Sequence, residues 1–229
     1  MKPASPMDRA FLTDDPDAGH LLLVRHGQQE FPDPETATVA DWVDPPLSAL
    51  GQQQATAVGK YLADHPVSTV YSSHLSRAHN TGLAVAGAHG LDVSVVPGLA
   101  EIELFSQLDD DARPVDVLGE QAIQGVRERF VQARTWDVYP YSESSLEFRR
   151  RVGYSIEGIM AHHPGETVVV ACHSGVINLI TAMVLGLETD FVFRAAHASV
   201  SWLRFGNEKR VIESLNDHSF LRPVELLSY

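Results

Sequence analysis

Two apolar runs in this sequence each lead to a histidine and a tight turn, and they constrain the fold more than any other feature. The first run covers residues 21–24 and leads to His26, and the second covers residues 168–172 and leads to His173. Unbroken apolar runs of this length are typical of strands that are buried on both faces of a parallel sheet. Ligands of open α/β sheets bind at the carboxyl ends of such strands. We therefore expect both histidines at the binding edge of one sheet.

Further strand-like segments alternate with helix-like segments along the chain. Besides the two runs above, strands are expected at residues 67–72, 93–96 and 200–205. The helices expected between them are residues 48–65, 77–89, 118–134, 144–162 and 176–185. Ser48 is a residue type that caps helix N-termini, and Gly90 and Gly186 suit the position that follows a helix. This alternation of elements is typical of an α/β fold.

The length of 229 residues predicts one domain. Residues 1–18 contain prolines and aspartates but no hydrophobic signal core, so we expect a flexible N-terminal segment there. Residues 19–229 then form the single domain. Within this domain, residues 105–141 are acid-rich and weakly periodic, which predicts a lid-like insertion above the sheet rather than a central layer.

Charge and cysteine content exclude several classes of protein. The net charge of −13 argues against a general binder of nucleic acid or of membrane surfaces, because such proteins need a basic face. No apolar run in the sequence is long enough to span a bilayer. The single cysteine, Cys172, fits a reducing compartment, so we expect a cytoplasmic protein. Its place inside an apolar run predicts a buried core residue rather than a reactive thiol.

The residues at the expected strand ends suit phosphate chemistry. Arg25 directly precedes His26, and a third strand-like run is followed by Arg77 at the start of a helix. If the three strands are neighbours, their carboxyl ends bring two arginines and two histidines into one pocket. Arginine binds phosphate oxygens through two parallel hydrogen bonds, and an imidazole can share that work.

Phosphoryl transfer also needs a nucleophile and a proton for the leaving group. A neutral imidazole can attack phosphorus directly and form a phosphohistidine, and His26 is the better candidate for that role. The proton donor should be a carboxylic acid, and the segment after the 93–96 strand offers Glu101 and Glu103. Spacing alone does not choose between these two glutamates.

These motifs resemble the histidine phosphatase superfamily, the phosphoglycerate mutase-like group. The resemblance spans about residues 20–217 and follows the family's order. The matching motifs are Arg25-His26-Gly27-Gln28, Pro46-Leu47-Ser48, Tyr71-Ser72-Ser73, Leu75-Ser76-Arg77-Ala78, Glu143-Ser144, Arg151-Val152, Cys172-His173-Ser174-Gly175 and Ala198-Ser199-Val200. The resemblance implies a three-layer α/β sandwich, with a mostly parallel central sheet and helices on both faces. Residues 19–229 would then be a histidine phosphatase domain.

The resemblance also assigns roles to the residues of the pocket. It implies that His26 is the nucleophile that accepts the phosphoryl group, and that Arg25, Arg77 and His173 form the phosphate pocket. It implies that no metal and no organic cofactor takes part.

The same resemblance selects one of the two glutamates. The family places its catalytic glutamate two residues after a leucine, and Leu99 makes that residue Glu101. The side chain of Gln28 and the backbone amide of Ser174 are implied as lesser contacts to the substrate.

The chain departs from the family pattern just after the opening triplet. Gln29 and Pro32 stand where the family commonly has threonine or serine, and then asparagine. Proline cannot donate an amide hydrogen bond, so one usual contact to the phosphoryl group is missing or is supplied elsewhere. Ser174 replaces a common glycine, and His197 stands where asparagine is frequent.

Hydrolysis of a small-molecule phosphomonoester is the activity that we predict, as in a histidine-type acid phosphatase. The alternative is a mutase of the phosphoglycerate type, which the resemblance associates with extra basic residues. Here the segment after Glu101 carries the acidic residues 109–111, which would repel a multiply charged sugar phosphate. A second alternative is a non-catalytic module that binds a phosphorylated ligand. The oligomeric state is open, with a homodimer as one option.

Overall fold

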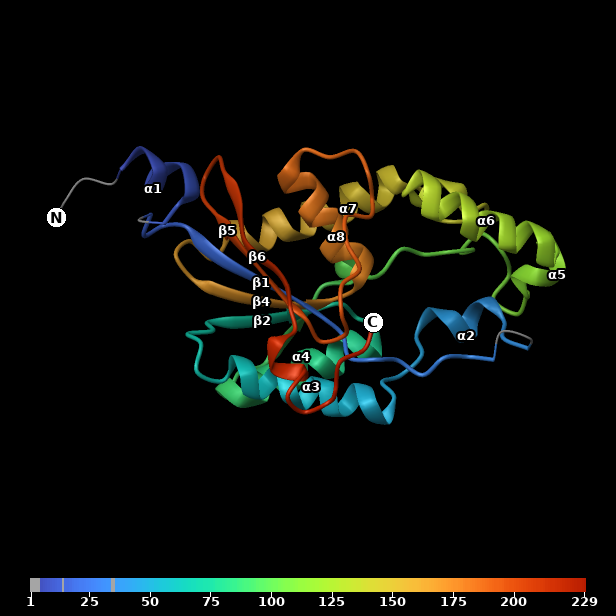
Figure 1. The fold of residues 1–229 in the computed structure, drawn as a ribbon, viewed down its shortest axis with the longest axis horizontal. Coiled ribbons are helices and arrows are strands. Elements are labelled where there is room, and N and C mark those ends of the chain that lie inside the picture. Colours follow the sequence, from blue (N-terminus) through green and yellow to red (C-terminus); the bar gives the residue numbers. More distant parts are fainter. Residues whose placement is uncertain (1–4, 14, 34–35) are drawn as a thin grey trace.

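The computed structural model describes residues 5–13, 15–33 and 36–229, and the strands of this part form one sheet of six (Figure 1). The strand order is β3-β2-β4-β1-β5-β6. The strands are β1 (Gly19–Arg25), β2 (Thr69–Ser72), β3 (Val93–Val95), β4 (Thr167–Cys172), β5 (Val200–Phe205) and β6 (Arg210–Asp217). The first four of these run parallel, whereas β5 and β6 are antiparallel to their neighbours. The prediction of a mostly parallel sheet is confirmed.

Strand β1 lies next to β4 near the middle of the sheet, and both are buried along nearly their whole length. His20 pairs with Thr167 at one end of this register, and Arg25 pairs with Cys172 at the other. The two apolar runs therefore end at the same level. Whatever follows Arg25 and Cys172 in the sequence is brought to the same point of the sheet edge.

Helices cover both faces of the sheet (Figure 1). One face carries α7 (Ser145–Ala161) and α8 (Ser174–Leu185), and the other carries α3 (Ala49–Leu62) and α4 (Ser76–His89). The side chains of β1 alternate between the two resulting cores, because successive residues of a strand point to opposite faces. Leu21 and Leu23 belong to the core under α7 and α8. Leu22 and Val24 belong to the core over α3 and α4, so the three-layer sandwich is confirmed.

Helix boundaries agree with the capping signals in the sequence. Ser48 caps α3 by accepting a hydrogen bond from the amide of Gly51 at 3.1 Å. Gly90 and Gly186 follow α4 and α8 in the left-handed conformation, which glycine adopts without steric cost. Cys172 is fully buried, as predicted, and burial raises the pKa of its thiol.

Several elements have no counterpart among the predicted ones. They are α1 (Pro6–Phe11), α2 (Val39–Val43), α5 (Pro114–Leu118), the 3₁₀ turns η1 (Pro97–Leu99), η2 (Trp136–Val138) and η3 (Ser219–Leu221), and the edge strand β6. The short helices are below the length at which hydrophobic periodicity is informative. Strand β6 has no fully buried residue, so it lacks the apolar run that marks a central strand.

The insertion at residues 105–141 contains α5 and α6 (Glu120–Ala133), which lie beyond the sheet at the right of Figure 1. Its loop is tied to α2, because the amides of Val39 and Ala40 donate to the carbonyl oxygens of Ala112 and Asp110 at 2.9 and 3.0 Å. A lid function of this insertion stays a prediction. So does the division into a flexible segment 1–18, of which residues 1–4 and 14 lie outside the described part, and a single domain 19–229.

Two glycines allow the segment after β1 to lie against the first turn of α3. A Cβ atom on Gly51 would collide with the carbonyl oxygen of Gln28, and one on Gly27 would collide with the carbonyl oxygen of Gly51. Gly51→Ala should therefore lower the free energy of unfolding by about 1–3 kcal/mol, as overpacked sites do.

The matched control is Gly87→Ala, because Gly87 is exposed in α4 and a Cβ atom there would meet no heavy atom within 4 Å. That change should be neutral or should stabilise by up to about 1 kcal/mol, owing to the higher helix propensity of alanine. Urea unfolding curves measure both. Equal stability of the two variants would contradict the close approach at Gly51.

Candidate active site

The ends of β1 and β4 place two histidines side by side. The amide of His26 donates to the carbonyl oxygen of Cys172 at 2.9 Å, so the parallel ladder continues by one step beyond β1. The imidazole rings of His26 and His173 have their centroids 5.1 Å apart. Both side chains are buried, with His26 4% and His173 0% exposed.

A backbone carbonyl fixes the tautomer of His26. The Nδ1 atom of His26 lies 2.6 Å from the carbonyl oxygen of Gly27. A carbonyl oxygen can only accept, so Nδ1 must carry the hydrogen and donate it. The lone pair of the neutral ring is therefore on Nε2. Gly27 is itself held, because its amide donates to the hydroxyl of Thr81 at 3.1 Å.

Burial keeps both of these imidazoles neutral. It is the main cause that lowers the pKa of His26 well below 6.5, and the nearby His173, Arg25 and Arg77 lower it further. The pKa of His173 is lowered well below its ordinary value by the same main cause, with Arg77, Arg25 and Arg151 adding to the effect. An uncharged His26 with its lone pair on Nε2 has the form that a nucleophile requires.

Arg25 is the last residue of β1, and two acceptors hold its guanidinium. One terminal nitrogen donates to the carbonyl oxygen of Ala195 at 2.6 Å, and the other lies 2.9 Å from Nε2 of His197. The remaining nitrogen, Nε, is buried and has no hydrogen-bond partner among the described residues. Burial lowers the pKa of Arg25 to about 10, while the charge of Glu101 raises it. Arg25 is thus a cation at neutral pH, and its Nε–H group is free to donate a further hydrogen bond.

Arg77 lies in the first turn of α4, where its guanidinium donates to the carbonyl oxygen of Val43 at 3.1 Å and lies 3.5 Å from a carboxylate oxygen of Asp44. Its Nε atom is buried without a partner in the described part of the chain, as are both ring nitrogens of His173. Buried polar atoms are almost always hydrogen-bonded in native proteins. The Nε–H groups of Arg25 and Arg77 and the single N–H of neutral His173 are therefore donors without an acceptor in the described part of the chain.

Glu101 lies in the extended segment after η1, with its carboxylate at the first turn of α8. One carboxylate oxygen accepts from the amide of Gly175 at 3.0 Å, and the other accepts from the amide of Ile102 at 3.1 Å. A Cβ atom on Gly175 would collide with this carboxylate, so the glycine is needed for the approach. The charge of Glu101 acts on both Arg25 and Arg77.

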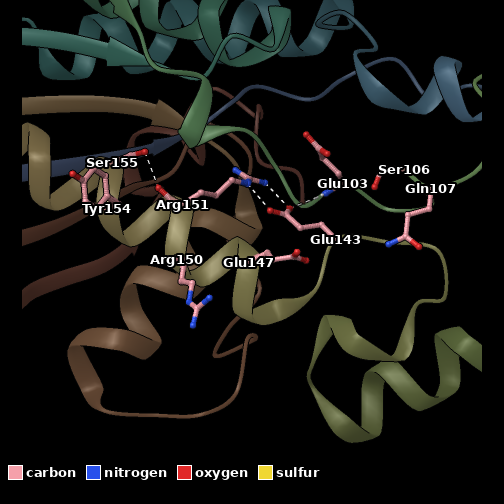
Figure 2. A pocket seen from close by; sticks show the side chains of 9 residues that line it. All are labelled: Glu103, Ser106, Gln107, Glu143, Glu147, Arg150, Arg151, Tyr154 and Ser155. Atoms are coloured by element: carbon pink, nitrogen blue, oxygen red, sulfur yellow. Dashed lines mark hydrogen bonds and ion pairs between the residues drawn. The ribbon is translucent and has the colours of Figure 1, made fainter.

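Glu103 faces a different environment. Its amide donates to a carboxylate oxygen of Glu143 at 3.3 Å, and its side chain lines an open pocket of about 780 Å³ beside the first half of α7 (Figure 2). None of the residues predicted to bind or transfer phosphate lines that pocket. The structure therefore separates the two glutamates, which the spacing could not do.

Arg151 on α7 clamps the loop that carries Glu101. It donates to the carbonyl oxygens of Gly98, Ala100 and Glu101 at 3.1, 2.8 and 2.9 Å. Its other hydrogen bonds go to the two carboxylate oxygens of Glu143, at 2.6 and 2.7 Å (Figure 2). Both residues belong to motifs of the family resemblance, but only the structure shows which backbone atoms they bind.

Gln28 and Ser174 are the predicted lesser contacts to the substrate, Ser174 through its backbone amide. The side chain of Gln28 accepts from the hydroxyl of Ser48 at 3.1 Å, and its amide donates to Gln54 at 2.7 Å. Ser174 is the first residue of α8, and its carbonyl oxygen accepts from Asn178 at 2.9 Å. The roles of the Gln28 side chain and of the Ser174 amide as contacts to the substrate stay predictions.

Sequence reasoning missed Gln54 and Ser228, whose hydrogen bonds hold the segments on either side of His26. Nothing in their local sequence marks them, because each is an ordinary polar residue whose partner lies far away in the chain. Among the described residues, no group of three histidine, cysteine, aspartate or glutamate side chains is arranged to hold a metal ion. None of the helices in that part has the length and apolar character that a bilayer crossing requires.

Comparison with known proteins gives the family. A sequence profile of the histidine phosphatase superfamily (branch 1) matches residues 21–218. Because this match covers most of the chain, the protein belongs to the histidine phosphatase superfamily, as the motifs predicted.

Relatives and solved structures agree with this assignment. The chain is 28% identical over 204 residues to "Phosphoserine phosphatase 1" of Hydrogenobacter thermophilus. The aligned region covers 86% of this chain and 91% of that relative. It is 25% identical over 211 residues to "Probable phosphoglycerate mutase GpmB" of Yersinia enterocolitica, which covers 88% of this chain and 94% of that one. The structure of phosphoglycerate mutase from Bacillus anthracis has a TM-score of 0.72 at 21% identity, over 92% of this chain and 99% of the other, and so shares the fold.

Three buried neutral histidines should make the protein less stable in acid. Burial lowers the pKa of His26, His173 and His197, the last to about 3, whereas histidines of the unfolded chain titrate near 6.5. Below pH 6.5 the unfolded state therefore binds more protons than the native state, and the free energy of unfolding falls as the pH falls. Each histidine contributes up to about 1.4 kcal/mol per pH unit.

The variant His197→Gln removes one of these groups. Between pH 6 and pH 5, the free energy of unfolding of both proteins should decrease. The decrease in the variant should be smaller than that in the unaltered protein by about 1 kcal/mol per pH unit. Urea unfolding at a series of pH values measures the slope. An unchanged slope would show that His197 is protonated in the native state.

Proposed function

We propose that the protein hydrolyses small phosphomonoesters through a phosphohistidine on His26, with Glu101 as the general acid, as a histidine-type acid phosphatase does. The observation that carries the proposal is the hydrogen bond from Nδ1 of His26 to the carbonyl oxygen of Gly27, at 2.6 Å. It leaves the lone pair on Nε2, and burial keeps the ring neutral. His173, Arg25 and Arg77 are near enough to lower the pKa of this imidazole, and each has a buried donor, without a partner in the described part of the chain, that can serve a phosphoryl oxygen.

The first half of the proposed reaction forms the phosphoenzyme. Nε2 of His26 attacks phosphorus, and the bond from phosphorus to the ester oxygen breaks. Glu101 gives its proton to that oxygen, so the alcohol leaves neutral. The two arginines stabilise the negative charge that spreads over the phosphoryl oxygens.

The second half releases phosphate. A water molecule attacks phosphorus, the bond between nitrogen and phosphorus breaks, and the carboxylate of Glu101 takes up the proton of the water. The enzyme returns to neutral His26 and protonated Glu101, and the products are one alcohol and one inorganic phosphate. The Arg151 clamp supports this double use of Glu101, because it holds the loop in one place through both steps.

The second candidate is a phosphoglycerate mutase-type phosphotransferase, which the likeness to the probable mutase from Yersinia favours. The likeness to a phosphoserine phosphatase favours hydrolysis. The acidic residues Asp109, Asp110 and Asp111 in the insertion also favour hydrolysis, because they would repel a multiply charged sugar phosphate. With phosphoglycerate as substrate, release of inorganic phosphate indicates a phosphatase, and formation of an isomeric phosphoglycerate indicates a mutase.

Replacement of the nucleophile tests the proposed chemistry directly. His26→Ala should lower kcat by at least about a thousandfold, as the loss of a covalent nucleophile does. Rapid quenching of the unaltered protein with a labelled aryl phosphate should trap a phosphoenzyme that is stable in alkali and labile in acid. The variant should form none.

His162→Ala is the matched control, because His162 is exposed at the end of α7. It should keep both turnover and the phosphoenzyme. Full turnover by His26→Ala would refute the assignment of the nucleophile. If the unaltered protein bound phosphate but turned over no ester, the chain would be a binding module, the third candidate.

Glu101 and Glu103 form a second matched pair. Loss of the general acid matters most when the leaving group is a poor one, since an activated aryl oxide leaves without a proton. Glu101→Gln should therefore slow an alkyl phosphate by about 100-fold or more and an activated aryl phosphate far less. Glu103→Gln should slow both substrates little. Steady-state kinetics with the two esters measure the contrast, and an equal loss in the two variants would contradict the choice of Glu101.

A further inference from the structure

The guanidinium of Arg25 depends on a histidine that comes from a distant part of the chain. One terminal nitrogen of Arg25 lies 2.9 Å from Nε2 of His197, and the rings of His197 and His26 have their centroids 5.9 Å apart. Arginine has donors only, so Nε2 of His197 must accept this hydrogen bond. The hydrogen of the neutral ring is then on Nδ1.

That Nδ1 atom lies 2.9 Å from the hydroxyl oxygen of Ser228, to which it therefore donates. The amide of His197 also donates to the carbonyl oxygen of Ser228 at 3.0 Å. Ser228 thus fixes both the backbone and the ring of His197. Burial, followed by the charge of Arg25, lowers the pKa of His197 to about 3, so the ring is a neutral acceptor at neutral pH.

The same serine reaches the other end of the Arg25-His26-Gly27-Gln28 turn through Gln54. Nε2 of Gln54 donates to the hydroxyl oxygen of Ser228 at 2.8 Å and to the carbonyl oxygen of Leu226 at 2.7 Å. Its Oε1 atom accepts from the amide of Gln28 at 2.7 Å. The hydrogen bonds therefore run from Arg25 through His197, Ser228 and Gln54 to Gln28, and they enclose the turn that carries His26.

We infer that His197 is a positioning residue that aims Arg25 at the phosphoryl group, and that Ser228 makes the segment 226–228 part of the phosphate site. The inference rests on the proposed function, because it takes Arg25 to be a phosphate ligand. His197 can hold Arg25 because its two ring nitrogens act in opposite senses, one accepting from Arg25 and the other donating to Ser228. A side chain at position 197 that has no acceptor where Nε2 of His197 lies cannot hold Arg25 in this way.

Two substitutions of His197 test the role. Gln places an oxygen near the position of Nε2 and so can still accept from Arg25, whereas Leu has a similar volume and no acceptor. His197→Leu should raise the inhibition constant of inorganic phosphate, and the KM of an aryl phosphate, by about tenfold or more, since a hydrogen bond to a charged group is lost. His197→Gln should recover most of this loss. Ser228→Ala, which changes a half-buried residue, should give an intermediate effect.

A double-mutant cycle with Arg25→Lys separates positioning from a general structural effect. If His197 acts through Arg25, His197→Leu should lower kcat/KM by about tenfold in the unaltered protein and by less than about threefold in the lysine background. Equal effects in the two backgrounds would overturn the inference. An inhibition constant of inorganic phosphate that is unchanged in His197→Leu would also overturn the inference. Circular dichroism and thermal unfolding establish that each variant is folded.

The proposed function and this inference fail in different ways. If the unaltered protein neither hydrolyses phosphomonoesters nor binds inorganic phosphate, the proposed function is wrong, and the inference falls with it. If the unaltered protein does both and the cycle is additive, only the inference is wrong. His162→Leu is the control, because His162 is exposed and far from this network in the sequence, and it should leave the phosphate constant unchanged.

Discussion

The parallel pairing of β1 with β4 is the interaction on which the candidate site depends. Its register places Arg25 opposite Cys172, so the two histidines that follow these residues meet at one point of the sheet edge. Both strands are buried between helices, and a shift of the register by one residue would exchange their side chains between the two cores and would separate Arg25 from Cys172. The cores on the two faces of the sheet therefore also fix the geometry of the site.

The candidate site places two arginines near two buried histidines, and this has two consequences. Neutral imidazoles are favoured, because burial and the neighbouring arginines both oppose a further positive charge. Donors of Arg25, Arg77 and His173 stay without partners among the described residues, and such groups are costly to bury. In the proposed function, the oxygens of a phosphoryl group accept hydrogen bonds from these donors and so offset that cost.

Around this centre, hydrogen bonds from distant segments hold the loop of Glu101 and the side chain of Arg25 in place. Arg151 and Glu143 fix the loop of Glu101 from α7. His197 and Ser228 fix Arg25 from the far end of the chain. Preorganised groups of this kind need no rearrangement as charge develops, and so they contribute more than flexible ones would.

The sequence by itself determined the α/β class, the central strands and the longer helices, and it predicted that His26, His173, Arg25 and Arg77 come together at one sheet edge. These signals are local, because an apolar run, a cap or a motif is legible within a few residues. The tertiary structure showed the different surroundings of Glu101 and Glu103, which spacing alone could not distinguish, and only it joined His197 to Ser228 and revealed β6. Those features depend on which segments meet in space, and a half-exposed edge strand or a lone serine carries no local pattern that announces its partner.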